Sequence, residues 1–447
     1  MSEIAAYTAS GEAAIARVIS IVSAMAHSPP HTRELAISEL GENPRGIIAA
    51  VSPSHPDPHA WPQFVWSVGE EGSDPIVDLN GSPFRHDQYA QSGHYQSMLA
   101  DLQAVAALGV QVVRYGMPWR LAEPQPGTYD WSLWDRAFAA CEQAGVTPVV
   151  DLLHFGLPDH YPAFADPAWV DGFCRYVDAF LARYPQPRWF TPVNEPGITA
   201  TMTAFWGIWN DRLSSPADHA RVLANIVLAN LEALARVRAD RDGWWIGSEG
   251  FDVPVDPSGT MPHEVERRRA IAWLPWDLHL GVDPLPAAQY YLDPVDPAVL
   301  DRIRSLAVRD RLIAGHDFYP VCVGRVDGQP LDFTMDEMVE AGMGELRRWH
   351  QRYAQPFWIA ETSNLSLPVA DQSQWLTTLV AGLDGLRAEG LPVRGLCWYS
   401  RGDQFDWQTA LANPTGAVTQ VGLFDTSRVA RPVASLFQSL ARGSSGR

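Results

Sequence analysis

Two glutamates follow short apolar segments, Glu195 in TPVNEP and Glu361 in FWIAET. Two carboxyl groups that face each other across a pocket can cleave a glycosidic bond, because one protonates the leaving oxygen while the other attacks the sugar carbon or activates water. Other polar residues end similar segments: Arg114, His154, Asn194, Glu249, Asp317, Tyr319 and Asp406. The set contains neither a serine-nucleophile motif nor a metal-ligand spacing. We therefore expect paired-carboxylate chemistry, with no metal and no cofactor.

The basic residues exclude several other enzyme classes. All 33 are arginine, since the sequence contains no lysine. Schiff-base aldolases, pyridoxal enzymes and phosphate-loop ATPases each need an amine at a fixed place. The 52 acidic residues give a formal charge of -19, which repels phosphate backbones and anionic lipid. We expect no nucleic-acid or membrane partner.

The longest early apolar stretch, residues 13–26, is interrupted by Arg17 and preceded by Glu3 and Glu12. Negative charge in front of the stretch favours an amphipathic helix over a signal peptide. We therefore expect a cytoplasmic protein. Residues 1–60 are predicted to form a helical N-terminal extension and a linker rich in proline and histidine, and residues 61–447 a separate catalytic domain.

From residue 62 onward, short β-branched or aromatic runs alternate with longer helical patterns. The expected strands are 64–68, 110–116, 146–154, 188–194, 244–250, 313–319, 356–362 and 393–400. The expected helices between them include 95–108, 132–144, 168–184, 217–238, 335–353 and 372–389. Repeated βα units of this number predict a (β/α)8 TIM barrel, with its active site at the carboxyl ends of the strands.

The segments that carry these polar residues resemble glycoside hydrolase family 1. The likeness runs from about Phe64 to Phe424 and includes VRYG, TPVNEP, HDFYP, FWIAETS and WYSRGDQFDW. The resemblance implies a retaining β-glycosidase, with Glu361 as nucleophile and Glu195 as acid/base, acting on a small carbohydrate or glycoside. It also implies supporting or sugar-binding roles, including Trp398 beneath the sugar ring, for this set: Arg114, His154, Asn194, Tyr319, Trp398, Gln404, Asp406 and Trp407.

Several positions depart from the family pattern. Thr362 and Ser363 replace asparagine and glycine after the nucleophile, and Asp317 replaces an asparagine. The first strand offers no clear counterpart of the family's glutamine, and Asp406 is one methylene shorter than the usual glutamate. These changes indicate a divergent branch. The lack of lysine removes the phosphate clamp of phospho-glycosidases, so a neutral sugar is favoured.

Other interpretations stay open at this point. Glu195 and Glu361 could form a structural ion pair at the barrel rim, and Arg114 could serve only as a buried partner of Asp151. The chain could also be a biosynthetic transglycosidase acting on a small metabolite, or a sugar-binding protein without catalysis. Carboxyl groups about 5–5.5 Å apart would favour retention, whereas a separation of about 6.5–9.5 Å would favour inversion.

Overall fold

Eight parallel strands close into one barrel in a computed structural model of the chain, which describes residues 60–444. Around the barrel the strand order is β1, β4, β5, β6, β7, β9, β11 and β12. β1 closes the cylinder by pairing with both β12 and β4. The strand bounds are β1 Val65–Glu70, β4 Val112–Gly116, β5 Thr147–Asp151, β6 Trp189–Thr191, β7 Trp244–Ile246, β9 Leu312–Asp317, β11 Phe357–Glu361 and β12 Val393–Tyr399. The predicted TIM barrel is confirmed, and each of its strands overlaps an expected segment.

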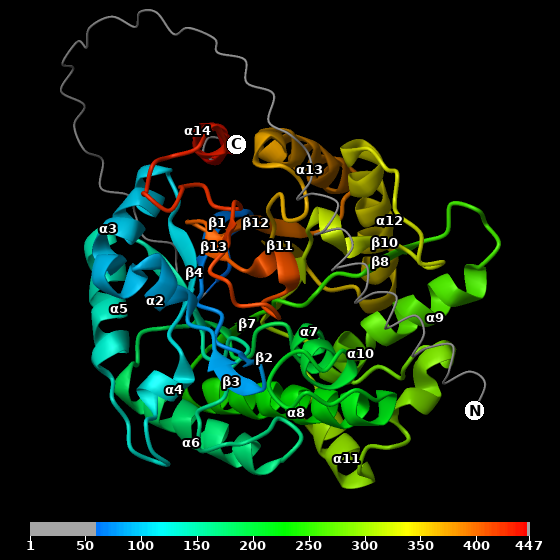
Figure 1. Cartoon of the computed structure of the whole chain (residues 1–447), viewed down its shortest axis with the longest axis horizontal. Coiled ribbons are helices and arrows are strands. Elements are labelled where there is room, and N and C mark those ends of the chain that lie inside the picture. The colour runs from blue at the N-terminus through cyan, green and yellow to red at the C-terminus, as the bar shows by residue number, and fades with distance from the viewer. Residues whose placement is uncertain (1–59, 445–447) are drawn as a thin grey trace, which may run out of the picture. The chain divides into compact units, whose positions relative to one another are not determined.

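Helices pack around the strands (Figure 1). Those expected from the sequence are α3 His94–Ala107, α5 Ser132–Ala144, α6 Ala168–Arg183, α8 Pro216–Asp240, α12 Met335–Tyr353 and α13 Gln372–Ala388. The helices α2 Gln88–Ser92, α4 Trp119–Ala122, α7 Pro196–Ala200, α9 Pro262–Ala272, α10 Leu274–Leu280, α11 Pro297–Leu306 and α14 Pro432–Ser444 were not among them. The predicted helical extension falls on residues 1–59, outside the described part of the chain. None of the described helices is long and apolar enough to cross a membrane.

The barrel interior is apolar towards the amino ends of its strands. Alternate residues of a strand face the same side, so Val65, Val112, Val149, Trp189, Ile246, Ile313 and Trp358 point inward together. Trp61 packs beneath them, with ring centroids 4.9 Å from Trp189 and 5.3 Å from Trp358. Further along their strands the inward positions include the buried polar residues Arg114, Asp151 and Asp317. The site therefore lies at the carboxyl ends of the strands.

A change of register in β11 turns Glu361 into the barrel. Trp358 and Ala360 belong to the interior cluster, so strict alternation would send Glu361 outward. The pairing of β11 with β9 shifts between Ile359 and Glu361, which re-aims the side chain as β-bulges do. Thr362 instead points to the helix layer, where its hydroxyl donates to Phe318 O at 2.7 Å. Thr362, a departure from the family pattern, therefore packs behind the site.

Loops at the carboxyl ends carry small elements of their own. These are β2 Ile76–Leu79, β3 Ser82–Arg85, the π-helix η1 Thr201–Phe205, β13 Gln404–Phe405 and β14 Val418–Thr419. The side chain of Asn210 joins three of the loops: it accepts from Ile76 N and donates to Phe155 O and Thr203 Oγ1, each at 3.1 Å.

Candidate active site

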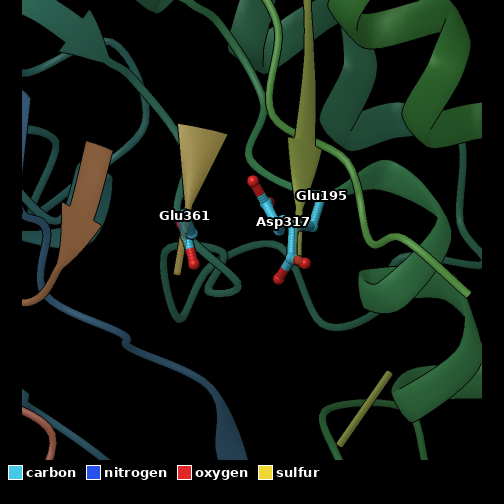
Figure 2. A group of neighbouring side chains, drawn as sticks. All are labelled: Glu195, Asp317 and Glu361. Atoms are coloured by element: carbon cyan, nitrogen blue, oxygen red, sulfur yellow. The ribbon is translucent and has the colours of Figure 1, made fainter. Parts of the chain in front are cut away.

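Three buried carboxyl groups converge at the carboxyl ends of β6, β9 and β11 (Figure 2). Glu195, Asp317 and Glu361 are 7%, 1% and 4% exposed, and one oxygen from each lies within 4.8 Å of the others. Retaining glycosidases hold their two carboxyl groups about 5–5.5 Å apart, and inverting ones about 6.5–9.5 Å apart. An oxygen of Glu195 and one of Glu361 thus lie close enough for both groups to reach one sugar carbon.

Both oxygens of Glu361 are held by donors. Arg114 Nη1 donates to Oε1 at 2.5 Å, and the hydroxyl of Tyr319 donates to Oε2 at 2.6 Å. A cation and a phenolic hydroxyl both stabilise a carboxylate, and together they fix its direction. Glu361 is therefore held as an oriented carboxylate.

Arg114 is fully buried and joins four acceptors. Besides Glu361, it contacts Asp151 Oδ2 from Nη2 and Glu71 Oε1 from Nε, each at 3.2 Å, and donates to Asn194 Oδ1. Burial alone would lower the pKa of this guanidinium, but the surrounding carboxylates, led by Glu71, raise it overall. Arg114 therefore contacts both Asp151, the buried partner considered from the sequence, and Glu361, a carboxyl group of the site.

Glu195 has a different environment from Glu361. Burial, followed by the negative charges of Glu361 and Glu249, raises the pKa of Glu195 well above its usual value. Glu249 lies beside it and accepts hydrogen bonds from Gly197 N at 3.1 and 3.0 Å and from Gly250 N at 2.9 Å, which fixes the start of α7. Burial raises the pKa of Glu249 to about 8. The surroundings of Glu195 thus favour its protonated form.

His154 and Asn194 complete the hydrogen-bonded set. His154 Nδ1 lies 2.8 Å from Asp151 Oδ2, and Asn194 Nδ2 lies 3.4 Å from His154 Nε2. Asn194 is therefore held between Arg114 and His154. The structure brings together six residues of the predicted set: Glu195, Glu361, Arg114, His154, Asn194 and Tyr319.

The family model for glycosyl hydrolase family 1 matches residues 81–273. Over this segment the chain is similar to the family. Solved structures share its fold at low sequence identity. A family 1 β-glucosidase from Thermotoga maritima in complex with isofagomine lactam is 16% identical, with a TM-score of 0.71, and covers 85% of this chain and 98% of its own. A β-glucosidase from Exiguobacterium marinum is 15% identical, with a TM-score of 0.72, and covers 86% of this chain and 99% of its own.

The prediction that Trp398 lies beneath the sugar is wrong. On β12, Cys397 belongs to the interior cluster, so Trp398 points outward to the helices. It is fully buried, and its indole donates to Val421 O at 3.0 Å. Tyr399, the next inward residue, is the aromatic side chain at this strand end. Its ring centroid lies 6.4 Å from that of His154, with the two planes 18° apart.

The prediction that Asp406 binds outer hydroxyls of a sugar is also wrong. Its buried carboxylate accepts from the backbone N–H groups of Thr415, Gly416 and Ala417 at 2.9–3.1 Å, and from Thr415 Oγ1 at 3.0 Å. These bonds occupy both oxygens in holding the 415–417 loop. Asp406 is a structural residue of the loop.

Gln404 and Trp407 stay candidates for sugar binding. Gln404 Nε2 donates to Ser400 Oγ at 2.7 Å, whereas its Oε1 is buried and has no hydrogen-bond partner among the described residues. The indole nitrogen of Trp407 is likewise buried without a partner there. An unpaired buried polar atom is costly unless it binds a ligand or water.

The sequence analysis missed Glu71 and Tyr399 and gave Asp317 no role. Inward alternation from Val65 through Ser67 and Gly69 reaches Glu71, and the same count along β12 reaches Tyr399. Counting alternate residues along these two strands was therefore the signal in the sequence that could have found both residues.

Glu195, Asp317 and Glu361 also form a group of acidic side chains able to hold a cation. A metal there would compete with Arg114 and Tyr319, which already occupy both oxygens of Glu361.

Proposed function

We propose that this family 1 glycoside hydrolase is a retaining β-glycosidase acting on a neutral glycoside, with Glu361 as nucleophile and Glu195 as acid/base. One observation carries the proposal: two carboxyl groups whose nearest oxygens are within 4.8 Å have opposite surroundings. Glu361 receives hydrogen bonds from Arg114 and Tyr319. Glu195 is buried among negative charges. A location in the cytoplasm is part of the proposal.

In the first half-reaction, Glu361 attacks the anomeric carbon while Glu195 gives its proton to the glycosidic oxygen. The bond to the aglycone breaks, and a glycosyl ester forms on Glu361. Asn194, held by Arg114, is placed to donate to the sugar hydroxyl next to the reacting carbon. Asn194 Nδ2 donates this hydrogen bond to the sugar hydroxyl and gives up its 3.4 Å contact with His154 Nε2.

In the second half-reaction, the carboxylate of Glu195 removes a proton from water, and the resulting oxygen attacks the anomeric carbon. The ester bond breaks, Glu361 leaves as a carboxylate, and Glu195 is protonated again. The guanidinium of Arg114 and the hydroxyl of Tyr319 stabilise the leaving carboxylate. The anomeric configuration is retained, since the carbon is inverted twice.

A panel of activated 2-fluoro glycosides, followed by peptide mapping, tests both the sugar and the nucleophile. We expect one sugar to label Glu361 and to inactivate the enzyme. Label on another residue would overturn the assignment. Formation of new glycosides with little free sugar would show transfer to an acceptor in place of hydrolysis.

Substitutions test the two roles separately. We expect Glu361→Gln to lower turnover by roughly 10⁴-fold or more, whatever the leaving group. Glu195→Gln should slow glycosides with poor leaving groups far more than activated aryl glycosides, because only the former need protonation. Glu389→Gln, at an exposed surface carboxylate, is the matched control and should leave turnover unchanged. Equal losses on both kinds of substrate in Glu195→Gln would contradict the acid/base role.

A further inference from the structure

Asp317 is a third carboxyl group in the site, and the mechanism above does not use it. It ends β9 and points inward between Glu195 and Glu361 (Figure 2). Its Oδ2 accepts from the hydroxyl of Ser248 at 2.6 Å. Its Oδ1 is buried and accepts no hydrogen bond from the described residues. One oxygen of this carboxyl group is therefore open towards the catalytic pair.

The groups that face Asp317 are mostly negative or neutral. Glu361 comes from β11, and Glu195 comes from the loop after β6. Ser248 and Glu249 come from the loop after β7. Tyr319 and Cys322 follow β9 itself. The hydroxyl of Tyr319 is already donated to Glu361, and the thiol of Cys322 lies 3.4 Å from the backbone oxygen of Asp317.

Arg114 is the cation that faces this group, and its nitrogens are directed at Glu361, Asn194, Asp151 and Glu71. Three carboxyl groups this close cannot all be ionised without a large electrostatic cost. Glu361 has both of its oxygens held by donors and is the group best suited to carry the charge. The protons therefore belong to Glu195 and Asp317.

We propose that Asp317 is a positioning residue that keeps its proton throughout turnover and directs its O–H towards Glu195. The inference rests on the proposed function, because it gives Asp317 a task only if Glu195 cycles between acid and base. The hydrogen bond is strongest after Glu195 has protonated the leaving group, since the acceptor is then a carboxylate. No bond of Asp317 breaks during the cycle. Burial and the charges of Glu361 and Glu195, in that order, raise the pKa of Asp317 well above its usual value.

The test compares Asp317→Asn with Asp317→Ala in pH profiles of kcat/KM. Asparagine keeps the shape and a hydrogen-bond donor and carries no charge. If Asp317 is neutral, Asp317→Asn should leave the midpoint of the basic limb in place, within about 0.3 pH unit. Asp317→Ala removes the donor, so the basic limb should move to higher pH. On an activated aryl glycoside, where the second half-reaction limits turnover, kcat should fall roughly tenfold to a hundredfold.

Two results would overturn the proposal. If Asp317 is ionised, Asp317→Asn removes a negative charge beside Glu195. The basic limb of the pH profile would then move to lower pH by roughly one unit or more. An unchanged profile and kcat in Asp317→Ala would leave Asp317 without this role. Asp310→Asn, at an exposed carboxylate, is the control. If Glu195→Gln and Glu361→Gln behave as expected while the Asp317 variants do not, only this inference fails.

Discussion

Glu195 and Glu361 carry the same carboxyl group, and their neighbours give them different properties. Arg114 and Tyr319 bind both oxygens of Glu361, whereas Glu195 is surrounded by Glu249, Asp317 and Glu361 itself. Hydrogen-bond donors stabilise Glu361 as a carboxylate, whereas burial among negative charges favours the protonated form of Glu195. The division of labour between acid and nucleophile therefore depends on where the single guanidinium of Arg114 points.

Tyr319→Phe tests this dependence at the level of one hydrogen bond. The ring keeps its packing, but Glu361 loses the donor on Oε2. We expect kcat/KM to fall roughly tenfold to a hundredfold, the effect of a hydrogen bond to a charged group. Tyr290→Phe, at an exposed tyrosine, is the matched control, and an equal effect in both variants would contradict the role.

Among the elements, the barrel strands could be predicted from the sequence because each is a short apolar run followed by a helical pattern. Helix ends marked by glycine were also visible: α5 ends at Gly145, which has a φ of 72°. The helices α9, α10 and α11 were missed. They lie within the long segment between β7 and β9, where the strand and helix pattern gives no regular spacing.

The site was only partly predictable, for a geometric reason. A motif shows which residues end a strand, but the direction of each side chain depends on register. Trp398 was chosen by its residue type, although alternation along β12 sends it outward and Tyr399 inward. Conversely, the register shift in β11 brings Glu361 inward against strict alternation. Asp406 was assigned to the sugar through the family resemblance, which does not show that the 415–417 loop binds its carboxylate. The roles of Glu195 and Glu361 stay predictions.

Tyr399→Ala and Trp398→Phe should separate the two faces of β12. Removal of the inward Tyr399 side chain takes away a wall of the site, and we expect KM to rise about tenfold, in line with the loss of one aromatic contact. Trp398→Phe leaves a cavity in the helix layer, which should lower the free energy of unfolding by about 1–3 kcal/mol without a change in KM. Thermal melts and steady-state kinetics on both variants check this. A raised KM in Trp398→Phe alone would restore the prediction from sequence.

For the molecule as a whole, buried acids make stability depend on pH. The pKa of Glu249 rises from its usual 4.5 to about 8 on burial, so the folded state binds a proton that the unfolded state has lost. The stabilisation that Glu249 contributes is complete at pH values below about 4.5, its pKa in the unfolded chain. It is lost as the pH rises from about 4.5 to 8. Glu195, Asp317 and Glu71 shift in the same direction.

We therefore expect the melting temperature to fall between about pH 7 and pH 8 at constant ionic strength. Below this range His219, His279 and His316, whose pKa values are lowered by burial, act in the opposite direction. Each such carboxyl group contributes up to about 1.4 kcal/mol per pH unit within its own window. Glu249→Gln should give a shallower slope than the parent chain, and calorimetry across this range measures both. A melting temperature that rises with pH would show that these acids are ionised in the folded state.

The pairing that closes the barrel joins Val65 to Gly395. A ribosome making this polypeptide has already added both catalytic glutamates when it reaches Glu361, yet β12 is still to come. Contacts between such distant parts of a chain form slowly, because the intervening polymer must first be brought together. If the proposed roles are right, catalysis should accordingly appear only after β12 has been made, and translation products that end before it would contain the two glutamates without the closed barrel.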